Sequence, residues 1–193
     1  SIDVPATRTL TLGPGVVFKG FGSNTVVVNG TLLTNGSPVA PVVFTSHTDD
    51  SAAGDTNNNG PSSGAPGNWR GINFGSASDA STLKWTEVRF GGNAGVNAIN
   101  LSSADISMTN CTVRDAFVEG MDLSGSSRPT VSHTKFLDNG SYAVNSVEID
   151  AVPRFSFNTA SGNGVAGFGG DYLRVTDGVP TADVAIRDYN CLG

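Results

Sequence analysis

Between residues 83 and 164 the sequence repeats about every 24 residues, and this period limits the possible folds more than any other feature. The repeating segments are STLKWTEVRFGG, ADISMTNCTVRDA, PTVSHTKFLDNG and PRFSFNTASGNG. Aligned by apolar residues, they give three columns: Leu83, Ile106, Val131 and Phe155; Trp85, Met108, His133 and Phe157; Val88, Val113, Phe136 and Ala160. The first and third columns differ in spacing, which indicates one additional residue near Asn110. Alternating apolar residues at this period predict stacked coils of short strands.

The rest of the chain continues the same pattern. Residues 8–46 contain three short runs rich in Val, Leu, Thr and Phe, separated by Gly-Pro-Gly and Asn-Gly turns. Within the repeats, a third strand per coil is expected in four segments: Val96–Leu101, Val118–Leu123, Tyr142–Ile149 and Val165–Val175. The 25 glycines and the 15% of charged residues are typical of short strands and tight turns. We expect residues 1–193 to form one domain, because a repeat architecture of this length needs only one core.

Several N-terminal stretches resemble a known superfamily. LTLGPGVVFK, VNGTLLTNGS, PVVFTSHTDD, GDTNNNG and GNWRGINF, in this order, are similar to the N-terminal portion of bacterial secreted β-helix proteins of the pectate-lyase-like superfamily. The resemblance implies an all-β fold, a right-handed single-stranded parallel β-helix (solenoid) of about seven coils with three strands each. It implies no single function, because this superfamily includes lyases, glycoside hydrolases, adhesins and inert scaffolds.

A polar stretch at residues 47–68 interrupts the strands and is expected to leave the stack as one long loop. Its segment DTNNNG, residues 55–60, matches the first half of a calcium loop, in which alternate oxygen side chains converge on the ion. The predicted calcium ligands are Asp49, Asp50, Asp55, Asn57 and Asn59. Pro66 stands where an EF-hand has its bidentate Glu. A metal-free turn rich in Asn and Gly explains the same residues equally well.

The candidate catalytic residues also lie in or beside this loop. A pectate-lyase-like enzyme needs acidic calcium ligands beside an Arg or Lys base, and a glycoside hydrolase needs converging carboxylates. Such a site would form from His47, Asp49, Asp50 and Arg70 if the loop folds back onto Trp69. A solvated loop is the favoured alternative, because no second acidic cluster is visible in the repeat columns.

Three residues are candidate ligand contacts. Arg89 is aligned with Arg114, as Asp115 is with Asp138, and such charged ladders would bind an anionic or polyhydroxylated chain or pair with each other. Trp69 would either cover the loop or stack against a sugar ring.

Other aligned residues are interpreted as scaffold. Strict alternation assigns Trp85 and His133 to the core, so neither is expected to contact a ligand. The neighbouring column contains no threonine array, which argues against ice binding: Thr86, Cys111, Thr134 and Asn158.

The net charge and the hydropathy of the chain limit the kinds of partner to be expected. The net charge is −6 and the Lys and Arg residues are scattered, which argues against nucleic acid. No apolar run approaches the roughly 20 residues of a membrane-spanning helix. The composition favours a secreted or cell-surface protein. The expected partner is an extracellular polysaccharide or a cell-surface component.

The two cysteines are not expected to form a disulfide with each other. Cys111 and Cys191 lie about three coils apart, which is on the order of 14 Å at the strand spacing of about 4.8 Å. A disulfide requires Cα atoms within about 7 Å. Cys111 is therefore interpreted as a small buried residue.

The C-terminal sequence suggests an incomplete coil. Residues 182–186 repeat the pattern of residues 104–108, so the chain stops within a new coil. Exposed strand edges there would be covered by the rest of a longer protein or by end-to-end contact with another chain.

The leading functional hypothesis is a secreted, non-catalytic module for adhesion, carbohydrate binding or structural assembly, with a structural calcium in the loop. The alternative is a polysaccharide lyase or glycoside hydrolase, which an open groove at the loop would favour.

Overall fold

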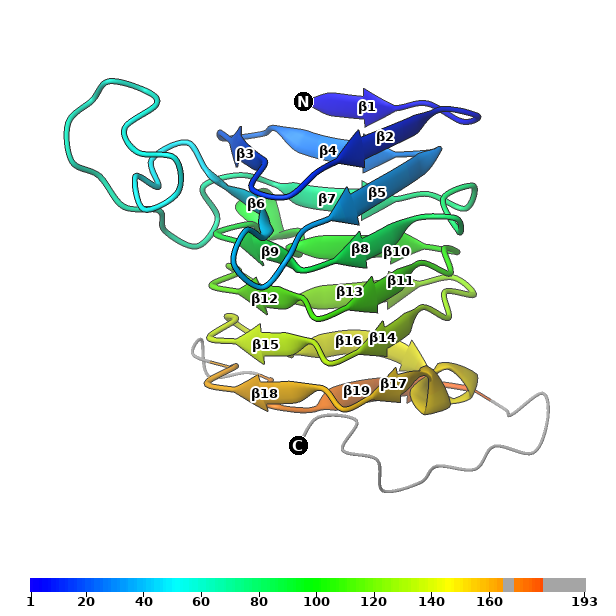
Figure 1. Cartoon of the computed structure of the whole chain (residues 1–193). Coiled ribbons are helices and arrows are strands. Elements are labelled where there is room, and N and C mark those ends of the chain that lie inside the picture. The colour runs from blue at the N-terminus through cyan, green and yellow to red at the C-terminus, as the bar shows by residue number, and fades with distance from the viewer. Residues whose placement is uncertain (165–168, 179–193) are drawn as a thin grey trace.

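The computed structural model describes residues 1–164 and 169–178, in which three parallel sheets wind into a β-helix (Figure 1). Sheet A consists of β1 (Ile2–Val4), β4 (Thr25–Val28), β7 (Gly71–Phe74), β10 (Ile99–Ser102), β13 (Met121–Ser124), β16 (Val144–Glu148) and β19 (Leu173–Asp177). Sheet B consists of β2 (Thr9–Leu12), β5 (Thr31–Asn35), β8 (Thr82–Lys84), β11 (Ser107–Thr109), β14 (Thr130–Ser132) and β17 (Phe155–Ser156). Sheet C consists of β3 (Val17–Gly20), β6 (Val42–Ser46), β9 (Thr86–Arg89), β12 (Thr112–Arg114), β15 (Lys135–Leu137) and β18 (Thr159–Ser161).

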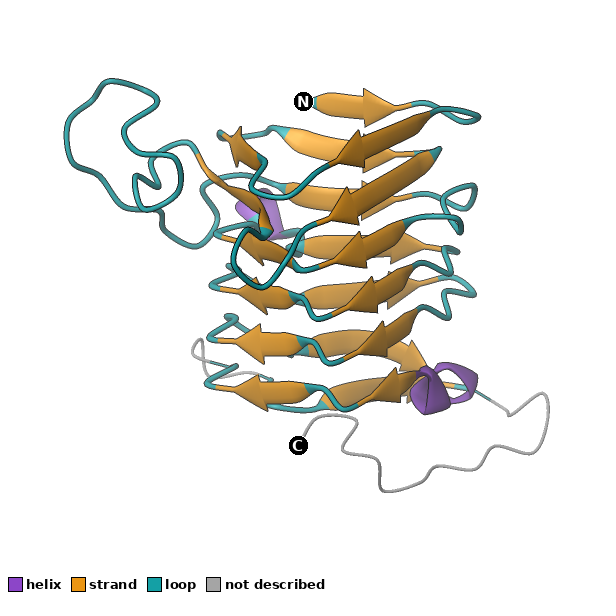
Figure 2. Ribbon diagram, viewed as in Figure 1, coloured by secondary structure: helices purple, strands orange, loops and turns teal. Residues whose placement is uncertain are grey.

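Each coil passes through sheets A, B and C in turn and then begins again on sheet A one strand further along. Among the described residues, the seven strands of sheet A mark about seven coils, which confirms the predicted all-β solenoid with three strands per coil. Figure 2 shows how little of the described chain is helical. It contains the short 3₁₀ helices η1 (Asn93–Gly95) and η2 (Ile149–Arg154), and no helix in residues 1–164 or 169–178 has the length and apolar character to cross a membrane.

The core is a stack of apolar columns, one or two from each sheet. In sheet C the predicted column is confirmed, because Val113 pairs with Val88 on one side and with Phe136 on the other. In sheet B the prediction is wrong at one row: the partner of Leu83 is Met108, two residues beyond Ile106. Both columns thus have the same spacing, and no additional residue is inserted near Asn110.

The turn between sheets B and C contradicts the predicted core position of the second column, which contains Trp85 and His133. In four successive coils the first residue of this turn has a positive φ: Trp85 (49°), Asn110 (56°), His133 (51°) and Phe157 (55°). The left-handed conformation interrupts the strand alternation, so that residues on both sides of the turn, such as Leu83 and Thr86, point inward. The prediction that Trp85 and His133 are core residues is therefore wrong: Trp85 is half-buried and His133 is exposed, as is Phe157.

The predicted loop is confirmed as an excursion from the stack between β6 and β7 (Figure 1). The predicted third strands correspond to strands of sheet A, namely β10, β13, β16 and β19. The echo at residues 182–186 lies outside the described residues, as does Cys191.

Candidate functional site

A groove of about 420 Å³ lies along the turn between sheets B and C. Its floor combines Trp85, Asn110 and His133 from the turns with the first outward residues of the following strands, which are Glu87, Thr112 and Lys135. Its wall is the segment that connects β5 to β6, through Ser37, Pro38 and Pro41. A groove of this volume is in the size range of small-molecule and cofactor sites.

The wall exists because one coil makes this turn differently. Asn35 pairs with Lys84 and Val42 pairs with Thr86, so residues 36–41 occupy the place that Trp85 alone takes in the next coil. The segment closes as a small hairpin through the bridge between Ser37 and Ala40. Gly36 permits the close approach to the neighbouring coil, since a Cβ there would lie 2.2 Å from the Trp85 carbonyl oxygen.

Most polar side chains on the groove floor have unused hydrogen-bonding capacity. In the described part of the chain, the side chains of Asn110, Thr112, His133 and Lys135 have no hydrogen-bond or ion-pair partner. Lys135 and His133 are exposed, while Asn110 and Thr112 are partly buried. Together with the Trp85 ring, they supply an apolar surface bordered by donors and acceptors, the combination that a polyhydroxylated ligand needs.

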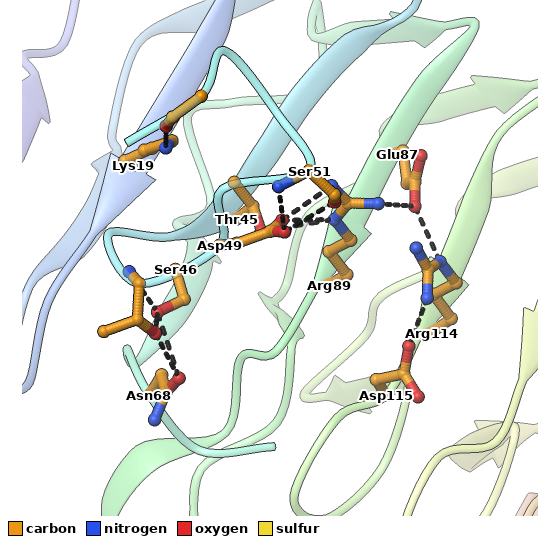
Figure 3. Close-up of polar contacts among 12 residues, drawn as sticks. Lys19, Thr45, Ser46, Asp49, Ser51, Asn68, Glu87, Arg89, Arg114 and Asp115 are labelled. Carbon is orange, nitrogen blue, oxygen red and sulfur yellow. Dashed lines mark hydrogen bonds and ion pairs between the residues drawn. The ribbon is translucent and has the colours of Figure 1, made fainter. Parts of the chain in front are cut away.

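The two predicted arginines lie beside the groove and are paired with acids (Figure 3). Arg89 is only 7% exposed and binds Asp49, with 2.6 Å between Nη2 and Oδ2. The Oε1 atom of Glu87 accepts from Arg89 Nη1 at 3.1 Å and from Arg114 Nε at 2.6 Å. Arg114 also pairs with Asp115. The charged residues of these columns are expected from the sequence either to bind a ligand or to pair with each other, and the structure favours pairing. Because Arg89 is buried in its ion pair, a ligand cannot reach it.

The pairing shifts the pKa values of two members. Burial by itself would raise the pKa of Asp49, but hydrogen bonds from Ser51 and Thr45 and the charge of Arg89 outweigh it and lower the pKa. For Arg114, burial opposes the charged form, yet Glu87 and Asp115 together raise the pKa of the guanidinium. Ion pairs between alternating acidic and basic side chains thus attach Asp49, near the start of the loop, to Arg89 and Glu87 on sheet C.

The four proposed catalytic residues are not joined by hydrogen bonds or ion pairs in the described chain. Asp49 is bound to Arg89, and Oδ2 of Asp50 accepts hydrogen bonds from Ser62. The ring of His47 packs edge-on against Phe21 at 4.7 Å. No hydrogen bond or ion pair joins any two of His47, Asp49, Asp50 and Arg70, all of which lie in the described part of the chain. The groove lies elsewhere, on the turn between sheets B and C.

The predicted calcium ligands are also divided. The carboxylate of Asp55 accepts the backbone N–H groups of Asn59 at 3.2 Å and Gly60 at 3.0 Å, so the DTNNNG segment wraps around this side chain. Asn57 donates to the His47 carbonyl oxygen. Asp49 is committed to Arg89, and within residues 1–164 and 169–178 no group of three or more His, Cys, Asp or Glu side chains is arranged to hold a metal.

Trp69 and Cys111 are structural residues. Trp69 is completely buried at the end of the loop, where its Nε1 donates to the Arg89 carbonyl oxygen at 2.8 Å. Its ring therefore covers the core, and no face is open for a sugar. Cys111 is 2% exposed, which confirms its interpretation as a small buried residue, and its pKa is raised to about 11 by burial. Cys191, its partner in the disulfide question, lies outside the described residues.

A pair of carboxylates on the outer face of sheet A was not visible in the sequence columns. The Asn145 amide donates to Asp122 at 3.0 Å and to Glu119 at 3.4 Å. Burial raises the pKa of Glu119, and the neighbouring Asp122 adds to the rise. This pair lies outside the aligned repeat columns, in which no second acidic cluster is visible. No sequence signal predicted this pair, because strict alternation over the expected strand Val118–Leu123 places residues three apart on opposite faces.

Comparison with known proteins defines the class of this chain. A model of the family described as "Right handed beta helix region" matches residues 70–191, which is more than half of the 193 residues. The chain belongs to this family of right-handed β-helices. Comparison with curated proteins gave no match, and neither did comparison with solved structures.

Proposed function

We propose that this chain is a secreted or cell-surface module that binds carbohydrate in adhesion or structural assembly and does not catalyse a reaction. The observation that carries the proposal is the groove, in which the half-buried ring of Trp85 lies among the unpaired side chains of Asn110, His133 and Lys135. Origin in a bacterium and membership of the pectate-lyase-like superfamily are part of the proposal, supported by the N-terminal stretches quoted above.

A glycan array, probed with the wild-type protein and with Trp85→Asn, tests this function. Asn is the residue that already occupies the equivalent turn at position 110, so the substitution keeps the backbone conformation. We expect the wild type to retain a defined group of glycans and Trp85→Asn to lose them. Equal retention by both proteins would place carbohydrate binding outside the groove, and no retention by the wild type would contradict the proposed function.

We also propose that the loop at residues 47–68 binds a structural calcium ion. Three oxygen acceptors lie within 3.2 Å of the single hydroxyl of Ser62: the Thr48 carbonyl, Asp50 Oδ2 and Asn59 Oδ1. One proton cannot satisfy all three, and Asp50 Oδ1 is buried without a partner in the described chain. Calorimetry should detect binding by the wild type and weaker binding by Asp50→Asn. The absence of heat at millimolar calcium would leave a metal-free turn.

A second candidate function is glycoside hydrolysis on the outer face of sheet A. Its support is the pair Glu119 and Asp122, in which the raised pKa of Glu119 suits a general acid and Asp122 could act as base or nucleophile. Release of reducing sugars from polysaccharides, lost in Glu119→Gln and Asp122→Asn but kept in Trp85→Asn, would establish this activity. No release by the wild type would exclude it for the polysaccharides used.

A further inference from the structure

The four turn residues between sheets B and C form a row along the stack, which we call the corner ladder: Trp85, Asn110, His133 and Phe157. The backbones of these turns are hydrogen-bonded from coil to coil, since Trp85 N donates to Thr109 O and Asn110 N to Ser132 O. The row therefore advances by one strand spacing per coil, about 4.8 Å, and spans about 14 Å from Trp85 to Phe157.

Three of the four members present flat rings. His133 and Phe157 stack with their centroids 5.1 Å apart and their planes inclined by 24°. Phe157 is 56% exposed and lies beyond the groove lining, so the ladder extends outside the groove in one direction. Because stacked rings partly cover each other's faces, His133 and Phe157 offer their edges and the ring surface left exposed, an apolar strip along one line that suits an elongated ligand.

In the other direction the ladder is blocked. The hairpin of residues 36–41 takes the corner position in the coil before Trp85, and Ser37, Pro38 and Pro41 form the groove wall there. Two prolines and the bridge between Ser37 and Ala40 limit the conformations of this wall. A chain lying on the ladder therefore ends at Trp85, and in the described residues no hairpin of this kind interrupts the ladder from Trp85 to Phe157.

We infer that the groove binds the end of a linear glycan chain that lies parallel to the long axis of the stack, with its terminal sugar on Trp85 and the following sugars toward Phe157. This inference rests on the proposed carbohydrate-binding function and adds the direction, the minimum length and the terminal specificity of the ligand. Glu87, Thr112 and Lys135 form the parallel polar row that contacts the hydroxyl groups along one side of the chain.

The test uses linear oligosaccharides of cellulose, xylan and homogalacturonan, from the monosaccharide to the hexasaccharide, measured by calorimetry with the full chain. For the series that binds, affinity should rise up to about the length of the ladder and then become constant. Phe157→Asn should weaken binding of the longer oligosaccharides about tenfold, which corresponds to about 1.4 kcal/mol, and leave the monosaccharide or disaccharide unchanged. Trp85→Asn should weaken binding at every length, whereas Phe21→Ala, which removes an aromatic ring that is 61% exposed outside the groove, should have no effect.

Terminal specificity is tested with a cyclic oligosaccharide of the same sugar and linkage, which has no chain end. The wild type should not bind it, and a variant in which Gly-Gly replaces residues 37–40 should gain binding. If Trp85→Asn abolishes binding but Phe157→Asn acts equally at all lengths, the axial direction is wrong while the proposed function stands. Binding of the cyclic sugar by the wild type would overturn the terminal specificity, and no binding in any series would contradict both the inference and the proposed function.

Discussion

At the residue scale, the buried ion pair of Arg89 and Asp49 attaches the long loop to sheet C. Replacing Arg89 by Met leaves the Asp49 carboxylate buried with only hydroxyl and amide donors. We expect a loss of about 3 kcal/mol in the free energy of unfolding, typical of breaking one side of a buried ion pair. Denaturant titration measures it, with the exposed Arg8→Met as a control that should change stability by less than about 0.5 kcal/mol.

The same pair makes stability depend on acid pH. Because the pKa of Asp49 is lowered in the folded protein, its contribution is fully present above the ordinary value of 3.8 and is lost as the pH falls through the folded value. The stability difference between the wild type and Asp49→Asn should therefore be largest near neutral pH and shrink below about pH 4. A difference that stays constant down to pH 2 would show that the Asp49 charge contributes nothing.

Cys111 gives the opposite dependence at alkaline pH. Its thiol has a pKa of about 11 in the fold against an ordinary value of 9.0, so ionisation favours the unfolded chain as the pH rises above 9. The wild type should lose stability relative to Cys111→Ala between pH 9 and 11, by on the order of 2 kcal/mol. In the native protein at pH 8, mass spectrometry should find the Cys111 peptide unmodified by iodoacetamide, and rapid labelling would mean that the thiol is accessible.

At the scale of elements, the repeat predicted the strands well and the turns poorly. Apolar residues such as Val88, Val113 and Phe136 share one strand position, so their period in the sequence is their order in the core. A turn residue in the left-handed conformation has no such sequence pattern, because Trp, Asn, His and Phe all occupy this position here. Strict alternation then assigns Trp85 and His133 to the wrong side.

The sequence did not reveal the candidate site, both because strict alternation misassigned the turn residues and because the site combines segments that are distant in the sequence. The groove depends on side chains that the alternation had assigned to the core, and on a hairpin wall whose place is set by strand register. Asp49 and Arg89 are separated by 40 positions, and no local pattern relates them. The loop was identifiable from its composition, but its contacts were not.

The assignment of Trp85 to the turn between sheets B and C predicts that its substitution affects stability less than that of a core residue. A non-Gly side chain other than Asn or Asp at φ near 50° costs about 1 kcal/mol, so Trp85→Asn should leave the free energy of unfolding within about 1 kcal/mol of the wild type. Trp69→Ala, by contrast, removes a completely buried ring and should cost about 3–5 kcal/mol. Thermal and denaturant unfolding of both variants make the comparison. A large loss of unfolding free energy in Trp85→Asn would show that Trp85 is a core residue after all.

At the scale of the whole molecule, stability is expected to depend on how many coils surround a residue. Ile99 is completely buried in β10, which pairs with β7 and with β13, whereas in the described chain the strand of Ile2 pairs only with β4. Ile99→Ala removes contacts with both neighbouring coils and should cost about 2–5 kcal/mol, while Ile2→Ala should cost less than about 1 kcal/mol.

Hydrogen exchange provides the matching measurement without a substitution. Because each coil contacts only its neighbours, the amides of β10 and β13 should open only with the whole stack, and those bonding β1 to β4 should exchange through local opening with a smaller free energy. The contrary result is that both sets of amides exchange with the same free energy and that Ile2→Ala is as destabilising as Ile99→Ala. The stack would then unfold as one cooperative unit, without local opening of the first coil. The groove, between the hairpin of residues 36–41 and the coil of His133, would then be as rigid as the centre of the core.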